Sequence, residues 1–323
     1  MWPFGASCLK AKELSFRKNM NYLDLYNSGE LSRRIREGYR RLAGCDLCPH
    51  NCGVNRLAGQ VGRCGAGKMP RIASANIHRG EEPPISGTKG SGTIFLSGCT
   101  LSCKFCQNFP ISQLRNGTDL TVAELADKMV GLQKRGAHNI NFVTPTHYTP
   151  QIMAALFVAI RKGFRIPIVW NTSGYEKVDT LKHLDGVVDI YLPDMKYVDD
   201  EEAARLSGAP GYREINRAAV IEMLRQVGHL ECDDNGIGKR GLIIRHLVLP
   251  EGRAGSTETL PWIAEHLGEE THIALMSQYF PAHAATSTPG IERRVNAEEY
   301  GEAVEALEDA GLENGWVQDE PAE

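Results

Sequence analysis

The sequence predicts an α/β protein: a partial (β/α)6 TIM-like barrel with an N-terminal helical and cysteine-rich metal-binding extension. Six short apolar segments, each followed by a segment of helical period, indicate a parallel sheet with right-handed crossovers. Two groups of closely spaced cysteines, one before this pattern and one inside it, indicate metal ligation. We therefore divide the chain into an extension over residues 1–69, a connector over residues 70–92, and a core with a C-terminal helix over residues 93–323.

Residues 10–43 begin the extension and are predicted to be helical, because apolar residues recur three or four positions apart among Lys, Arg and Glu. A group of arginines lies on this segment: Arg33, Arg34, Arg36, Arg40 and Arg41. A solvated helix face is the simpler interpretation of this group, and contact with an acidic partner is the alternative.

The first cysteine group consists of Cys45, Cys48, Cys52 and Cys64. Glycines between and beside these cysteines allow the backbone to turn sharply around a metal. Zinc and an iron–sulfur cluster both accept four thiolates, so the group predicts a second metal site and leaves the metal open. With four thiols available, His50 is interpreted as a neighbour of the site and not as a ligand.

The connector and the core follow in order. The connector is rich in Gly and Pro and is predicted to be a loop, either a passive linker or a cover over a cofactor. Thr121 with Glu124 and Asn296 with Glu299 form capping boxes, and Thr149 is expected to cap a helix that has Pro150 in its first turn. Strands are expected at 93–96, 140–143, 167–170, 187–192, 242–249 and 273–276. Helices are expected at 121–135, 150–163, 177–184, 200–207, 214–227, 257–267 and 297–310.

Polar residues follow or interrupt the predicted strands at the edge where parallel sheets bind ligands. A buried charge such as Arg245, within the fifth strand, requires a partner or a ligand. We expect these side chains to converge on one cleft, although each of them singly is also compatible with a structural role. The candidates are Thr144, Thr146 and His147 after the second strand, Asn171 and Ser173 after the third, Asp194 and Lys196 after the fourth, and Arg245.

The second cysteine group lies on the loop after the first strand and consists of Cys99, Cys103 and Cys106. Cysteines at this spacing can converge on a cubane iron–sulfur cluster, and one of its four irons then lacks a protein ligand. A structural zinc loop or buried thiols are the alternatives, but zinc requires a fourth ligand and none lies close in the sequence.

This C-x3-C-x2-C stretch resembles the cluster motif of the radical S-adenosylmethionine (SAM) superfamily. Further phrases resemble the pyruvate formate-lyase-activating-enzyme-like proteins that carry an N-terminal four-cysteine segment. The phrases are Gly92-Thr93-Ile94-Phe95, Phe105-Cys106-Gln107-Asn108, Asn141-Phe142-Val143-Thr144-Pro145-Thr146-His147, Asp189-Ile190-Tyr191-Leu192-Pro193-Asp194 and Gly315-Trp316-Val317-Gln318.

The resemblance implies a [4Fe–4S] cluster on Cys99, Cys103 and Cys106 that reduces SAM and releases a hydrogen-abstracting 5′-deoxyadenosyl radical. It places Phe105 near the adenine and the polar residues of the strand ends near SAM. It also implies an electron donor such as flavodoxin or ferredoxin. The substrate is either a glycine on a partner enzyme or another peptide or metabolite. A non-catalytic zinc or redox-sensing module is the alternative from a different class.

The composition limits the classes of partner. The net charge of −4, with acidic and basic residues interspersed, provides no electrostatic attraction to nucleic acid or to an anionic membrane. No apolar run approaches the ~20 residues of a membrane span, and the start of the chain lacks the pattern of a signal peptide. Short cysteine spacings favour metal ligation in a reducing compartment, so a cytoplasmic location is expected.

Overall fold

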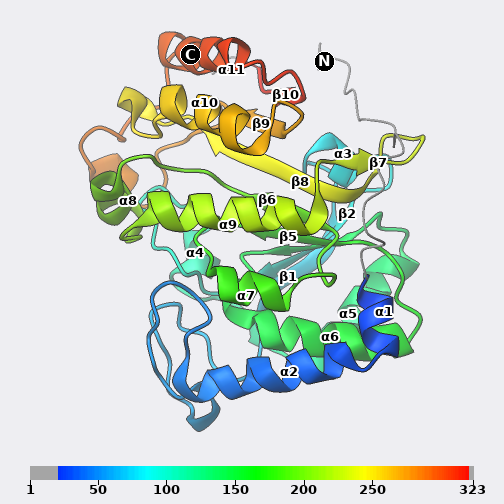
Figure 1. Cartoon of the computed structure of the whole chain (residues 1–323). Helices are drawn as coiled ribbons and strands as arrows, with labels where there is room; N and C mark the ends of the chain where they lie inside the picture. Colours follow the sequence, from blue (N-terminus) through cyan, green and yellow to red (C-terminus); the bar gives the residue numbers. More distant parts are fainter. Residues whose placement is uncertain (1–20, 320–323) are drawn as a thin grey trace.

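A single ten-stranded sheet runs through the computed structural model, which describes residues 21–319 of the chain (Figure 1). Its strands are β1 (Arg71–His78), β2 (Ser91–Leu96), β3 (Thr118–Asp119), β4 (Ile140–Val143), β5 (Ile168–Thr172), β6 (Ile190–Pro193), β7 (Glu231–Cys232), β8 (Gly238–Leu247), β9 (His272–Met276) and β10 (Gly315–Val317). The strand order is β10-β9-β8-β6-β5-β4-β2-β1-β3, and β7 pairs with β8 at the side of this path.

The six strands predicted from the sequence are present as β2, β4, β5, β6, β8 and β9, and they pair in parallel in that order. The mixed α/β fold with a largely parallel, open sheet is therefore confirmed. The fourth strand begins at Ile190 instead of residue 187. A seventh parallel strand, β10, pairs with β9; it is three residues long, too short for an apolar pattern to predict it.

The prediction that residues 70–92 form a loop is wrong. Arg71–His78 is strand β1, which pairs antiparallel with β2, and Pro83–Ser86 is a short helix, α3. Only Ile72 of β1 is fully buried, so the segment lacks the apolar pattern that predicts a strand from sequence. Its pairing with β2 decides the structure, and the connector is thereby part of the sheet.

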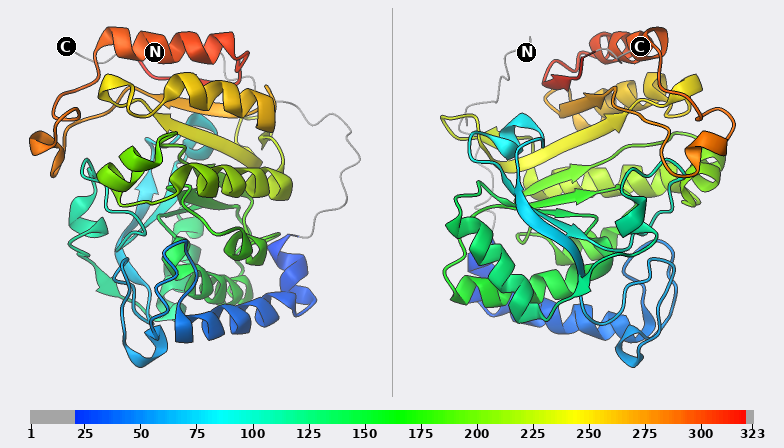
Figure 2. Two further views of the ribbon diagram at one scale, coloured as in Figure 1. Left: turned by 60° about the vertical axis from the view of Figure 1, so that its left-hand side comes forward. Right: turned by 180° about the vertical axis from the view of Figure 1, so that it is seen from behind.

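The helices cover the outer face of the curved sheet (Figure 2). All predicted core helices are present, and both predicted capping boxes form. Thr149 does not cap α6: the cap is Tyr148, and the Thr149 hydroxyl donates to the Thr146 carbonyl (2.8 Å). The bounds are α4 (Phe109–Ser112), α5 (Val122–Lys134), α6 (Thr149–Arg161), α7 (Val178–His183), α8 (Asp200–Ser207), α9 (Tyr212–Val227), α10 (Ser256–Leu267) and α11 (Ala297–Asp309).

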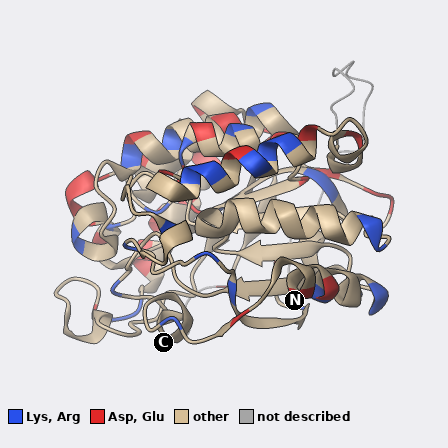
Figure 3. Cartoon of the chain, turned by 90° about the horizontal axis from the view of Figure 1, so that it is seen from below, with Lys and Arg blue, Asp and Glu red and all other residues tan. Residues whose placement is uncertain are grey.

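The extension contributes two helices, α1 (Tyr22–Asn27) and α2 (Glu30–Arg41), and α2 packs along α6. The predicted helix over 10–43 is therefore confirmed in part, with a break at Ser28 and Gly29, and residues 10–20 lie outside the described residues. Lys and Arg as well as Asp and Glu occur along the helices, while the strands consist mostly of uncharged residues (Figure 3). No helix within residues 21–319 has the length and apolar character needed to cross a bilayer.

Candidate active site

The loop over residues 98–106, here called the cluster loop, follows β2 and carries three cysteines. It begins at Gly98, whose φ of +84° favours glycine and whose added Cβ would lie 2.4 Å from the Cys64 carbonyl oxygen. Its middle is fastened to the end of α8: the Ser102 N–H donates to the Ser207 carbonyl (2.9 Å) and the Lys104 N–H to the Leu206 carbonyl (2.8 Å). Backbone contacts thus hold the loop at the carboxyl end of the sheet.

Each thiol of the cluster loop has a hydrogen-bond partner. The Leu101 N–H donates to Cys99 Sγ (3.3 Å), the Ser207 hydroxyl donates to Cys103 Sγ (2.9 Å), and Cys106 Sγ lies 3.2 Å from Ser112 Oγ. Burial raises the pKa of Cys99 and of Cys103, and the Lys196 ammonium opposes that rise at Cys103. These partly buried thiols ionise readily only when iron replaces their protons, while hydrogen bonds to sulfur are a means of tuning a cluster.

A cavity of about 270 Å³ opens beside the three thiols. Its volume is close to the lower end of the range for small-molecule sites. Ten of the predicted residues line it: Cys99, Cys103, Phe105, Cys106, Thr144, Asn171, Ser173, Asp194, Lys196 and Arg245. They come from loops and strands up to about 150 positions apart in the chain, and the parallel sheet brings them to one edge.

Asp194 binds two cations inside this cavity. Its Oδ1 accepts from Arg245 Nε (2.8 Å) and Nη2 (2.7 Å), and its Oδ2 lies 2.7 Å from Lys196 Nζ. Burial alone would raise the pKa of Asp194, but the charges of Arg245 and Lys196 outweigh burial and hold that pKa below its ordinary value. The carboxylate is therefore charged at neutral pH, and the group carries one net positive charge toward the cavity.

Glu82, which sequence reasoning missed, lies behind Arg245. Its Oε1 is 3.9 Å from Arg245 Nη1, and its buried Oε2 has no hydrogen-bond partner. Burial raises the pKa of Glu82 despite the opposing charge of Arg245. Only its place just before the proline-rich helix α3 sets it apart in the sequence, and that position does not reveal that the connector enters the barrel.

Thr144, at the end of β4, has a strained backbone. Its φ of +58° lies in the left-handed region, which a β-branched residue rarely adopts. The Thr144 N–H donates to the Asn171 carbonyl (2.8 Å), which fixes the turn above β4 and β5. Strain at a residue that lines a cavity is typical of binding sites.

Thr146 and His147 do not line this cavity, although the resemblance places them near SAM. The Thr146 hydroxyl donates to the buried carboxylate of Glu176 (2.7 Å), and His147 Nε2 lies 2.9 Å from the Ser97 carbonyl oxygen. The 3₁₀ turn Thr146–Tyr148 directs both side chains into the protein. Burial lowers the pKa of His147 to about 4, so the imidazole is neutral.

Aromatic side chains form another wall of the cavity. Phe105 packs edge-on against Tyr279 with ring centroids 5.7 Å apart. Phe280, which sequence reasoning did not single out, also lines the cavity and is 45% exposed. An exposed aromatic at the end of a barrel strand is a signal that only becomes visible once burial is known.

The other cysteine group also converges. Cys45, Cys48, Cys52 and Cys64 line one small cavity of about 10 Å³ together with Arg56 and His147. All seven cysteines of the two groups carry free thiols, whereas Cys232 is disulfide-bonded. Within residues 21–319, no three His, Cys, Asp or Glu side chains are placed as ligands of a single metal ion.

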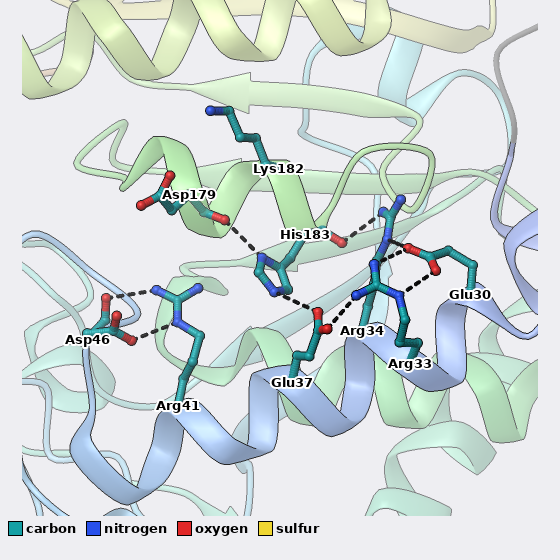
Figure 4. Close-up of a pocket in the computed structure, with 9 residues that line it drawn as sticks. All are labelled: Glu30, Arg33, Arg34, Glu37, Arg41, Asp46, Asp179, Lys182 and His183. Atoms are coloured by element: carbon teal, nitrogen blue, oxygen red, sulfur yellow. Dashed lines mark hydrogen bonds and ion pairs between the residues drawn. The ribbon is translucent and has the colours of Figure 1, made fainter.

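A larger groove of about 460 Å³ lies between α2 and α7 (Figure 4). The charged side chains that line it pair with one another: Arg33 and Arg34 with Glu30, and Arg41 with Asp46. The predicted basic face of α2 is thus partly neutralised by acidic neighbours. We place the candidate active site at the smaller cavity, where the thiols lie.

The residues around the thiols fit a [4Fe–4S] cluster with SAM. Three cysteines face an open cavity with no fourth cysteine among its lining residues. Phe105 offers an aromatic face, and Lys196 and Arg245 offer cations for a carboxylate. The cavity therefore has partners for the apolar, the cationic and the anionic parts of such a ligand.

Comparison with known proteins identifies the class. The chain matches the model of the Radical SAM superfamily over residues 93–247. It belongs to this superfamily of enzymes, which implies a [4Fe–4S] cluster and SAM as cofactors. It is 31% identical to the uncharacterized protein MJ0674 of Methanocaldococcus jannaschii, over 97% of this chain and 88% of that relative.

Solved structures are similar at a lower level. A radical SAM methyltransferase from Sphaerobacter thermophilus has a TM-score of 0.47 and 16% identity, covering 93% of this chain and 94% of that one. HydG, a maturase of the [FeFe]-hydrogenase, has a TM-score of 0.47 and 13% identity. That match covers 69% of this chain and 50% of HydG, so the chain spans half the length of HydG.

Proposed function

We propose that the protein cleaves SAM reductively and uses the resulting radical to abstract hydrogen from a residue of a protein or peptide, for example a glycine of a glycyl-radical enzyme. The observation that supports the cofactor site most directly is the convergence of three thiols, an aromatic ring and a buried Asp–Lys–Arg group on one cavity. When bound there, a [4Fe–4S] cluster with SAM supplies one-electron cleavage of SAM and a hydrogen-abstracting radical.

The chain's own residues have separate roles in this proposal. Cys99, Cys103 and Cys106 hold the cluster. Lys196 and Arg245 bind the SAM carboxylate, and Asp194 holds both cations in place through contacts of 2.7–2.8 Å. Hydrogen bonds from Leu101 and Ser207 to the sulfurs of the cluster loop set the electron affinity of the site.

Exposed side chains near the cavity support a large substrate and an electron-donor protein. Phe280 at the cavity is 45% exposed, and Leu114, two residues after the cavity-lining Ser112, is 63% exposed. Exposed apolar residues beside an active site are typical of contact with another protein. Gln107 and Asn108, exposed next to Cys106, offer the approach for a flavodoxin or ferredoxin.

The test is anaerobic reconstitution with iron and sulfide, followed by dithionite and SAM. The wild type is expected to form 5′-deoxyadenosine, and Cys103→Ala is expected to abolish it because one of three iron ligands is lost. Lys104→Ala, on the same loop with a side chain that does not line the cavity, should retain cleavage. Cleavage by Cys103→Ala equal to that of the wild type would reject the cluster assignment.

The substrate is tested separately with deuterated candidates. Transfer of deuterium from a glycine-labelled partner protein into 5′-deoxyadenosine, together with a glycyl-radical signal in electron paramagnetic resonance, supports activation of a glycyl-radical enzyme. Transfer from another peptide or from a metabolite instead would make the protein a maturase or a small-molecule enzyme. Transfer from another peptide or from a metabolite would leave SAM cleavage in place and would reject the glycyl-radical enzyme as the substrate.

A further inference from the structure

The four-cysteine segment, residues 45–64, has a buried interior that the reaction at the cluster loop does not use. Cys45, Cys48 and Cys64 are each 8% exposed, and Cys52 completes the lining of their common cavity. The backbone comes close to these thiols: a Cβ added to Gly62 would lie 2.9 Å from Cys52 Sγ. Three of the four cysteines are therefore buried, while the exposed Cys52 lies at the surface end of the same cavity.

Arg56 brings a positive charge into this interior. It is 1% exposed, and no carboxylate within residues 21–319 lies in ion-pair distance of it. Its guanidinium donates to the Gly67 carbonyl (2.8 and 3.2 Å), to the His147 carbonyl (2.7 Å) and toward Cys45 Sγ (3.8 Å). A buried cation requires an anion, and thiolates of this segment are the anions within reach.

Two cysteines of the segment share a local turn with the cluster loop. In each case the backbone N–H of the residue two positions later favours the thiolate: that of His50 at Cys48, that of Ala66 at Cys64, and that of Leu101, which donates to Cys99 Sγ (3.3 Å). Such N–H groups stabilise a thiolate and are among the groups that tune iron–sulfur clusters. The segment thus repeats the sulfur environment of the loop where the family places its cluster.

The spread of the four thiols distinguishes a cluster from a zinc ion. A zinc ion in a tetrahedron of four thiolates lies about 2.3 Å from each sulfur, so its ligands must converge on a single point. Within residues 21–319, no three His, Cys, Asp or Glu side chains converge in this way, although the four cysteines line one cavity. Thiols that share a cavity without converging on one point favour a polynuclear cluster.

The segment also contacts the cluster loop directly. The Cys64 carbonyl packs against Gly98, His50 Nε2 lies 2.7 Å from the Thr100 carbonyl oxygen, and Arg63 Nη2 donates to Ser102 Oγ (2.6 Å). A group bound by the four cysteines would therefore lie beside the catalytic cluster and support the loop that holds it.

We propose that Cys45, Cys48, Cys52 and Cys64 bind a second iron–sulfur cluster, of the [4Fe–4S] class, whose negative charge is balanced by the buried Arg56. Each thiol releases its proton when it binds iron. This site is separate from SAM cleavage, so it stands or fails independently of the proposed reaction.

The metal content of the full-length protein tests the proposal. Anaerobically reconstituted wild type should contain about eight irons per chain, and a variant with Cys99, Cys103 and Cys106 all replaced by Ala should retain about four irons and about four sulfides. The converse variant, Cys45→Ser with Cys64→Ser, should lose about four irons and keep the signal of the remaining cluster. One zinc per chain at this site would overturn the proposal. It would also be overturned if the triple variant held no metal and the converse variant lost none.

The role of Arg56 is tested by redox titration. Arg56→Gln removes a buried positive charge, so the midpoint potential of the second cluster should become more negative while its iron content is retained. Arg63→Gln is the matched control, because Arg63 lines the same cavity but is exposed, and its potential should change less. Equal potentials for Arg56→Gln and the wild type would reject the counter-charge.

Discussion

Replacing Asp194 by Asn removes the carboxylate that holds two buried cations together. The side chains of Asp194, Lys196 and Arg245 are 9%, 15% and 23% exposed. Two unit charges about 4 Å apart attract by about 4 kcal/mol at an effective dielectric constant of about 20. Desolvation offsets part of this attraction, and breaking one partner of a buried pair costs about 3–5 kcal/mol. We expect Asp194→Asn to lower the free energy of unfolding of the cluster-free protein by that amount.

The chain contains a matched control at its surface. Arg71 and Asp119 form the same kind of two-pronged contact, at 2.7 and 3.0 Å, with side chains 40% and 46% exposed. Asp119→Asn should lower the free energy of unfolding by no more than about 1 kcal/mol. Urea titration followed by tryptophan fluorescence, under anaerobic reducing conditions, measures both variants. A loss for Asp194→Asn no greater than that for Asp119→Asn would refute the reasoning.

The same substitution separates the binding site from the scaffold. In cluster-loaded protein, Asp194→Asn should weaken SAM binding at least tenfold, or about 1.4 kcal/mol, because Lys196 and Arg245 lose the group that orients them. Calorimetry with matched iron contents measures this affinity. Unchanged affinity, together with reduced stability, would show that the group is structural only.

Two further predictions concern stability. Burial raises the pKa of Asp189 to about 7, although the Ile168 N–H, which donates to its Oδ2 (2.8 Å), opposes this rise. Between about pH 4 and about pH 7 the folded protein therefore keeps a proton on Asp189 that the unfolded chain has released. The wild type should therefore lose stability relative to Asp189→Asn as the pH rises from about 4 to about 7. Melting temperatures of both proteins measure this loss, and a difference between them that does not grow over this range would contradict the prediction. Thr144→Gly relieves a backbone strain of about 1–3 kcal/mol at φ +58°, so it should not lower the free energy of unfolding, whereas Thr118→Gly in the exposed strand β3 should lower it by about 1 kcal/mol. A larger loss at Thr144 than at Thr118 would show that the Thr144 side chain stabilises the turn.

Features that depend on a few adjacent residues could be predicted from the sequence. The spacing of Cys99, Cys103 and Cys106 is a property of a few adjacent residues, and the loop that carries them follows its strand as predicted. Thr121 and Asn296 cap their helices because a capping box spans only four residues. The alternation of apolar strand segments with segments of helical period predicted the parallel sheet, because strands that follow one another in such a chain usually pair with each other.

The convergence of the strand ends was also predictable, since all parallel strands present their carboxyl ends at one edge. Asn171, Asp194 and Arg245 therefore line one cavity as expected. Side-chain direction was not predictable at the end of β4, because the 3₁₀ turn after Thr144 rotates Thr146 and His147 away from the cavity. A single 3₁₀ turn is enough to direct a side chain from one face to another, and no local sequence pattern encodes such a turn.

Contacts between distant segments were decided only by the tertiary structure. Glu82 lies within reach of Arg245 because β1 pairs with β2 and carries the connector into the barrel. Arg56 reaches the His147 carbonyl, 91 positions away, because the extension folds back against the cluster loop. A buried charge has no preferred partner until chain packing excludes water around it. The spacing of the cysteines along the chain therefore determined which candidate metal ligands exist. The tertiary packing determined which charged side chains lie beside them.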